Sequence, residues 1–100
     1  MAIIHATEKN FNDVISSGIV IVDFFATWCG PCKMLGPVIE QLANKYENIS
    51  FVKVDVDECP NISKQYGIMS VPTLLKLKDG NILEQKIGYL NINEFEKWLN

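Results

Sequence analysis

Two cysteines separated by two residues carry the most reactive side chains of this sequence. Cys29 and Cys32 stand in the segment WCGPCK, directly after a tryptophan. A cysteine thiolate is a nucleophile, and a second sulfur this close can attack the first sulfur once that one has bonded to a target. The pair therefore predicts thiol–disulfide exchange, in which two sulfur atoms carry the electrons.

Two other interpretations of Cys29 and Cys32 stay open at this point. The first is half of a zinc site, but zinc needs four ligands, usually from two such pairs. The remaining candidates, Cys59 and His5, form no second pair. The second is a pair of unreactive core cysteines that are close by coincidence. A cysteine pair at a junction between a strand and a helix favours exchange, and we expect no metal.

The flanking segments predict such a junction. Residues 19–25, IVIVDFF, form a nearly continuous apolar run, which is typical of a strand buried on both faces. Residues 31–46 carry apolar side chains at helical spacing, with Pro31 in the first turn and Pro37 deeper, where it predicts a kink. Cys29 thus lies at a helix start, where unpaired N–H groups and the helix dipole stabilise a thiolate.

The rest of the chain continues the alternation of strands and helices. Asp79-Gly80-Asn81 predicts a hairpin, and the spacing of Asn91 and Glu94 predicts a helix capping box. Strands separated by helices indicate a parallel sheet covered on both faces, to which the hairpin adds an antiparallel edge. We predict an α/β fold in a single domain, residues 1–100. The further strands are expected at 2–6, 50–56, 73–78 and 82–88, and the further helices at 7–18, 59–67 and 91–100.

Composition excludes some classes of function. Of the 100 residues, 48% are hydrophobic and 21% are charged, which is ordinary for a globular protein. The net charge of −3 gives no electrostatic reason to expect nucleic-acid binding. No apolar run approaches the roughly 20 residues of a membrane span, and the start of the chain does not resemble a signal peptide. Three cysteines do not suggest a disulfide framework, so we expect a reducing compartment.

Several motifs together resemble the thioredoxin family. They are WCGPCK at 28–33, the strand that reads into it as VDFFATWCGPC, and VPT at 71–73. The resemblance extends over the whole chain in length and element order. It implies a central five-stranded mixed sheet flanked by four helices, in the order βαβαβαββα. It also implies that Cys29 is the attacking nucleophile and that Cys32 is the resolving, more buried thiol.

The same resemblance implies a function and its partners. The expected activity is that of a thiol–disulfide oxidoreductase which reduces disulfides in other proteins. No cofactor is expected to be bound, and NADPH is involved only indirectly, through thioredoxin reductase. Expected protein substrates include peroxiredoxins, ribonucleotide reductase and methionine sulfoxide reductase. The implied protein is a cytoplasmic monomer that binds neither nucleic acid nor membrane.

Two charged residues in predicted strands are candidates for supporting roles. Asp23 interrupts an apolar run, and burial of its carboxylate should raise its pKa. The alternative is a solvent-facing aspartate at a strand end, against which the apolar neighbours argue. The resemblance implies that Asp23 accepts a proton from Cys32. Lys53 is either a surface lysine with its stem on apolar residues or, as the resemblance implies, the electrostatic partner of Asp23.

The resemblance also implies a docking surface for substrates. Pro72 should follow a cis peptide bond and lie against the cysteine pair, so that the backbone of the preceding residue can pair with a substrate strand. A flat apolar patch should surround it, although Gly88 could equally be a plain turn residue. Besides Pro72, the expected docking residues are Trp28, Gly30, Pro31, Val71 and Gly88.

Some residues and some functions are left with alternatives. Cys59 is expected to be unreactive, with an oxidisable regulatory thiol as the alternative. Partner choice is expected to vary at Met69-Ser70, and Lys76 places an unexplained charge in an apolar strand. A binding subunit with incidental thiols, and an oxidase or isomerase, are the alternative functions. A histidine between the cysteines would favour oxidation, and its absence here favours a reductase.

Overall fold

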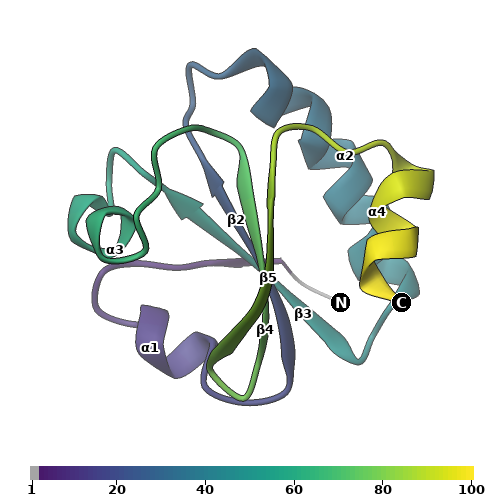
Figure 1. The fold of residues 1–100 in the computed structure, drawn as a ribbon, viewed down its shortest axis with the longest axis horizontal. Coiled ribbons are helices and arrows are strands. Elements are labelled where there is room, and N and C mark those ends of the chain that lie inside the picture. Colours follow the sequence, from purple (N-terminus) through teal and green to yellow (C-terminus); the bar gives the residue numbers. More distant parts are fainter. Residues whose placement is uncertain (1–2) are drawn as a thin grey trace.

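The computed structural model describes residues 3–100 and shows three layers (Figure 1). A five-stranded sheet with the order β1-β3-β2-β4-β5 lies in the middle. Helices α1 and α3 cover one face, and α2 and α4 cover the other (Figure 1). β3 pairs in parallel with β1 and β2, whereas β4 pairs antiparallel with β2 and β5. The predicted α/β fold, a five-stranded mixed sheet with four helices, is confirmed.

The elements follow the predicted order βαβαβαββα. The strands are β1 (Ile4–His5), β2 (Ile19–Phe25), β3 (Ile49–Asp55), β4 (Thr73–Lys78) and β5 (Asn81–Ile87). The helices are α1 (Phe11–Val14), α2 (Gly30–Lys45), α3 (Pro60–Gln65) and α4 (Ile92–Leu99).

The central strand β2 explains the nearly continuous apolar run in the sequence. It pairs with β3 on one side and β4 on the other, so its backbone is hydrogen-bonded along both edges. Its side chains alternate between two cores, since Val22 packs on the α1/α3 face and Ile21 on the α2/α4 face. By the same alternation Asp23 lies on the face that α2 covers. Both faces of β2 are therefore buried, and this strand ends where the cysteine pair begins.

Turn and cap residues form the structures that their types predict. β4 and β5 are joined through Asp79 and Gly80, which have φ values of 50° and 85°. Positive φ at both positions suits the tight twist of a hairpin turn, and glycine adopts it without strain. Asn91 and Glu94 form a capping box at the start of α4, as predicted. Pro37 lies inside α2 without ending the helix.

The N-terminal predictions are wrong in extent. The helix predicted at 7–18 is only Phe11–Val14. Before it, the side chains of Thr7 and Asn10 each accept a hydrogen bond from the other's backbone N–H. These local bonds compete with helix formation and hold the segment in a turn. The strand predicted at 2–6 is only Ile4–His5, and its first residue, Ala2, lies outside the described residues. The remaining boundaries agree within two residues.

Candidate active site

Cys29 and Cys32 lie at the junction of β2 and α2 and are joined by a disulfide, with their Cα atoms 5.3 Å apart. Cys29 is the N-cap of α2, and its sulfur accepts a hydrogen bond from the Cys32 backbone N–H at 3.2 Å. Pro31 occupies the first turn of the helix, where its missing N–H removes no bond. In the reduced protein, this N–H and the positive end of α2 would stabilise a thiolate at Cys29.

A loop from the other half of the chain lies against the cysteine pair. The Val71 carbonyl oxygen is 3.7 Å from the Cys29 sulfur, and the Val71–Pro72 peptide bond is cis. The Gly88 N–H donates a hydrogen bond of 2.8 Å to the Pro72 carbonyl. Gly88 has a φ of 98°, a conformation that favours glycine. The end of β5 is thereby tied to the proline loop, which in turn lies against the disulfide.

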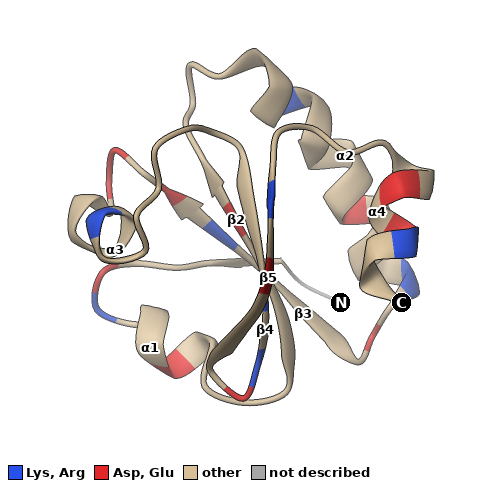
Figure 2. Ribbon diagram, in the orientation of Figure 1, with Lys and Arg blue, Asp and Glu red and all other residues tan. Residues whose placement is uncertain are grey.

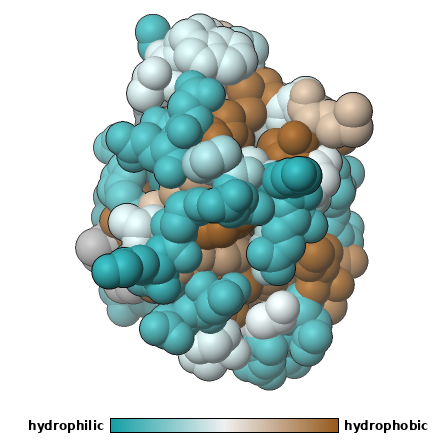
Figure 3. All heavy atoms as spheres, turned by 90° about the vertical axis from the view of Figure 1, so that its left-hand side faces the viewer, coloured by the Kyte–Doolittle hydropathy of each residue, from teal (hydrophilic) through white to brown (hydrophobic). Residues whose placement is uncertain are grey.

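Trp28 stands at the surface beside the pair, with 70% of its area exposed. Its indole Nε1–H donates a 2.9 Å hydrogen bond to Asp57 Oδ2, just beyond the end of β3. Next to it is a groove of about 180 Å³, lined by Trp28, Val56, Ile68, Met69, Ser70 and Val71. Figure 3 shows apolar atoms reaching the surface among hydrophilic ones on the side of the molecule that carries α1 and α3. The groove adjoins the disulfide through Val71, so it borders the path of any molecule that reaches Cys29.

Asp23 is the buried carboxylate of this site, with only 1% of its area exposed. Neither of its carboxylate oxygens has a hydrogen-bond partner within residues 3–100. Burial disfavours the charged form and raises the pKa of Asp23 from 3.8 to about 7. The alternative of a solvent-facing aspartate is thus ruled out. The site contains an acid that changes protonation near neutral pH.

Lys53 occupies the position opposite Asp23 on the neighbouring strand β3. Figure 2 shows the acidic segment of β2 next to a basic segment of β3. The Lys53 ammonium lies 4.5 Å from the centre of the Phe25 ring. Its positive charge lowers the pKa of Asp23, but by less than burial raises it. A pocket of about 260 Å³ borders both Lys53 and Cys32, so the two side chains face the same depression.

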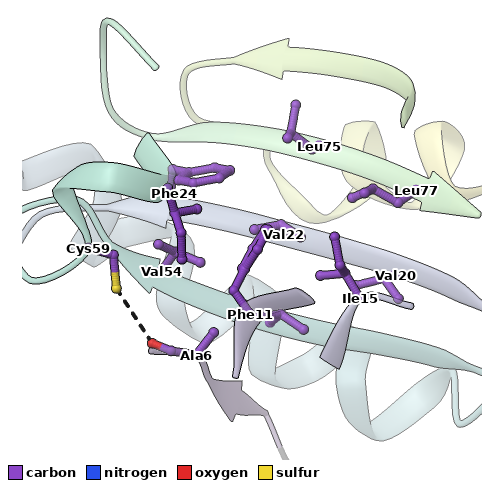
Figure 4. Packing of buried hydrophobic residues seen from close by; sticks show 12 residues of the cluster. Ala6, Phe11, Ile15, Val20, Val22, Phe24, Val54, Cys59, Leu75 and Leu77 are labelled. Carbon is purple, nitrogen blue, oxygen red and sulfur yellow. Dashed lines mark hydrogen bonds between the residues drawn. The ribbon is translucent and has the colours of Figure 1, made fainter. Parts of the chain in front are cut away.

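The other candidate ligands lie apart from the pair. Cys59 is packed in the core between the sheet and α1/α3, where its thiol donates to the Ala6 carbonyl at 3.8 Å (Figure 4). Burial is the main cause that raises the pKa of the Cys59 thiol. His5 is exposed on the edge strand β1. Within residues 3–100 no cluster of three or more His, Cys, Asp or Glu side chains could hold a metal.

The structure adds residues that the sequence analysis did not assign to the site. Asp57 holds the indole of Trp28, and Phe25 lies under the Lys53 ammonium. Val56 and Ile68 line the groove beside Trp28. Asp57 could have been suspected, because it follows the carboxyl end of β3 at the edge where the cysteine loop emerges. The contact of Phe25 needed the strand register, which the sequence alone does not supply.

Comparisons with known proteins agree with this geometry. The family model described as Thioredoxin matches residues 2–100. A thioredoxin of Chlorobaculum thiosulfatiphilum is 54% identical over 95 residues, which cover 92% of this chain and 88% of that protein. Thioredoxins of Staphylococcus saprophyticus and Bacillus subtilis are each 48% identical over 90 residues, covering 89% of this chain and 86% of theirs. The chain belongs to the thioredoxin family and is a thiol–disulfide oxidoreductase that uses its cysteine pair to reduce disulfides.

Proposed function

We propose that Cys29 is the thiol that attacks the target and that Cys32 resolves the mixed disulfide. Exposure does not separate the two, since 5% of Cys29 and 4% of Cys32 is accessible. Their positions support different roles. Cys29 caps α2 and lies next to Val71 of the proline loop, whereas Cys32 lies inside the first turn of α2. The capping N–H and the helix dipole favour the thiolate at Cys29, the form that attacks.

The two steps balance in atoms and electrons. The Cys29 thiolate bonds to one sulfur of the target disulfide, whose S–S bond breaks, and the other target sulfur leaves as a thiolate. Cys32 then loses its proton and bonds to the Cys29 sulfur, so the second target sulfur also leaves as a thiolate. The target gains two electrons, and the Cys29–Cys32 pair becomes a disulfide.

A trapping experiment tests these roles. The Cys32→Ser variant should accumulate a covalent adduct with a disulfide-containing protein, visible by mass spectrometry and removed by dithiothreitol. The matched variant Cys29→Ser should form no adduct, because it lacks the attacking sulfur. Adduct formation by Cys29→Ser in place of Cys32→Ser would reverse the assignment.

We further propose that Asp23 takes the proton that Cys32 releases during the resolving step, and that Lys53 tunes its acidity. The supporting observation is a buried carboxylate with a pKa of about 7 on the sheet face that α2 covers. A base with a pKa near the working pH is the most effective proton acceptor. Asp23→Asn should slow the resolving step by at least about tenfold and let the mixed disulfide persist. Lys53→Met should shift the pH profile of that step upward, since it removes the charge that lowers the pKa of Asp23.

We propose that substrate proteins dock on the surface around the proline loop. An exposed tryptophan held by Asp57, next to a carbonyl that faces the reactive sulfur, supports this assignment. The backbone of Val71 would pair with an extended substrate segment. The residues assigned to this docking surface are Trp28, Gly30, Pro31, Val71, Pro72 and Gly88. A Trp28→Ala variant should raise the KM for a protein disulfide while leaving the reaction with a small disulfide within about twofold.

The family also suggests the electron supply and the setting. We propose that thioredoxin reductase regenerates the dithiol with electrons from NADPH, which does not itself bind this chain. Peroxiredoxins, ribonucleotide reductase and methionine sulfoxide reductase are the proposed protein targets. We propose that the protein works in the cytoplasm as a monomer and that residues 1–100 form one domain. Among residues 3–100, no helix has the length and apolar character needed to cross a membrane.

A further inference from the structure

Among residues 3–100, Met69 is the most exposed large hydrophobic residue, with 96% of its area accessible. It lines the groove that also contains Trp28 and Val71. The groove borders the approach of a substrate protein to Cys29, because the carbonyl oxygen of its lining residue Val71 is 3.7 Å from the Cys29 sulfur. The exposed thioether of Met69 therefore lies in the groove that adjoins the Cys29–Cys32 disulfide.

A methionine at this place can both contact partner proteins and be oxidised. Its flexible, polarizable side chain fits partner surfaces of varied shape. Oxidation turns the same side chain into a sulfoxide, which is polar and chiral. The cysteine sulfur atoms are protected: Cys59 is buried with a raised pKa, and Cys29 and Cys32 share a disulfide. Met34 offers a comparison, since it is 60% exposed on α2 and does not line the groove.

We propose that Met69 is a site of oxidation by hydroperoxides and that its sulfoxide weakens the docking of substrate proteins. In the step, a hydroperoxide transfers one oxygen atom to the Met69 sulfur. The O–O bond breaks, an S–O bond forms, and the hydroperoxide leaves as water or an alcohol. The sulfur loses two electrons and the peroxide gains them. Because the effect acts on docking, this inference rests on the docking surface proposed above.

Oxidation of Met69 should weaken apolar contact with the substrate protein and leave the reactivity of the Cys29–Cys32 pair unchanged. A sulfoxide in the groove wall must stay hydrated, so the partner loses apolar contact equivalent to about one or two methylene groups. At about 0.8 kcal/mol for each methylene, the KM for a protein disulfide should rise roughly four- to fifteenfold. The rate with a small disulfide should not change, since such a molecule reaches Cys29 without filling the groove.

The test uses the full chain in its disulfide form, treated with hydrogen peroxide and then freed of peroxide by catalase. Peptide mass spectrometry follows the sulfoxides of Met69 and Met34. Reduction of insulin is then measured with dithiothreitol as the electron donor, and reduction of dithiobis(nitrobenzoate) is measured in single turnovers with protein that has been reduced and then freed of dithiothreitol. Met69→Leu keeps an apolar wall without an oxidisable sulfur, and Met34→Leu is the matched control. Each variant is compared with itself before and after peroxide.

The inference is supported if Met69 oxidises faster than Met34, the KM for insulin rises, and the small-disulfide rate stays constant. The response should vanish in Met69→Leu and persist in Met34→Leu. Equal oxidation of both methionines, an unchanged KM, or a response that survives in Met69→Leu would overturn it. An untreated protein that reduces neither disulfide would overturn the proposed function, and the inference with it.

Discussion

Asp23 and Lys53 face each other on adjacent parallel strands, yet neither oxygen of the carboxylate accepts a hydrogen bond within residues 3–100. The Lys53 ammonium instead lies over the Phe25 ring, 4.5 Å from its centre. A close ion pair would have kept Asp23 charged and its pKa low. Because no such ion pair is present among the described residues, burial has the larger effect on Asp23 and raises its pKa to about 7. The arrangement keeps Asp23 able to exchange a proton near neutral pH.

This relationship predicts an unusual dependence of stability on pH. Between pH about 4 and pH about 7, folded Asp23 keeps a proton that the unfolded chain has already lost. The free energy of unfolding should therefore fall as the pH rises through this window, by roughly 3–4 kcal/mol from this group. Asp23→Asn should remove that fall and be the more stable protein at pH 8.

Urea unfolding at a series of pH values measures this effect. The exposed Asp13 provides a matched control, because Asp13→Asn should keep the slope of the parent protein. A slope that is the same in the parent and in Asp23→Asn would show that Asp23 ionises normally in the folded state.

Cys59 should be inert in the native protein. Its thiol is buried in the core and its pKa is raised, so little thiolate is available at neutral pH. After reduction, iodoacetamide should label Cys29 within minutes and leave Cys59 unlabelled until the protein is unfolded. Peptide mass spectrometry distinguishes the two sites. Labelling of native Cys59 at a rate comparable with Cys29 would favour the regulatory thiol instead.

Lys76, which has no explanation in the sequence, anchors the C-terminal helix. Its ammonium donates to the Trp98 carbonyl, forms a 3.3 Å ion pair with Glu84, and lies over the Trp98 ring. The Trp98 indole N–H in turn donates to Glu84 at 3.2 Å. Lys76→Ala should lower the free energy of unfolding by about 1–3 kcal/mol, since it leaves the Trp98 carbonyl without this donor.

Chemical denaturation of Lys76→Ala and of Lys78→Ala separates this anchor from a general charge effect. Lys78 lies on the same strand but is exposed, so its loss should cost less than about 0.5 kcal/mol. Equal destabilisation of the two variants would contradict the anchoring role.

The fold was predictable from sequence where one pattern dominated. The apolar run at 19–25 and the helical spacing after Pro31 placed β2 and α2 correctly, and hence the cysteine pair between them. The segment before Phe11 was not predictable in the same way. There, the side chains of Thr7 and Asn10 each accept a hydrogen bond from the other's backbone N–H. In the sequence, the same residue types are equally typical of a helix start and of a turn.

The site was predictable only in part, because several of its contacts depend on strand register. The burial of Asp23 followed from its apolar neighbours, but its lack of a partner depends on Lys53 turning to Phe25. Likewise, Asp57 meets Trp28 across 29 positions of sequence. Such pairings arise because β2 and β3 lie side by side, so the sequence suggests them only once that strand order is assumed.

The reduction potential of the Cys29–Cys32 pair decides whether this protein works as a disulfide reductase. The protein would be equilibrated in dithiothreitol or glutathione redox buffers and followed by tryptophan fluorescence, with Cys29→Ser as the control. We expect one two-electron transition near the roughly −270 mV known for thioredoxin, absent from the control. A transition at roughly −120 to −180 mV would indicate an oxidase or isomerase, and no transition would contradict dithiol chemistry altogether.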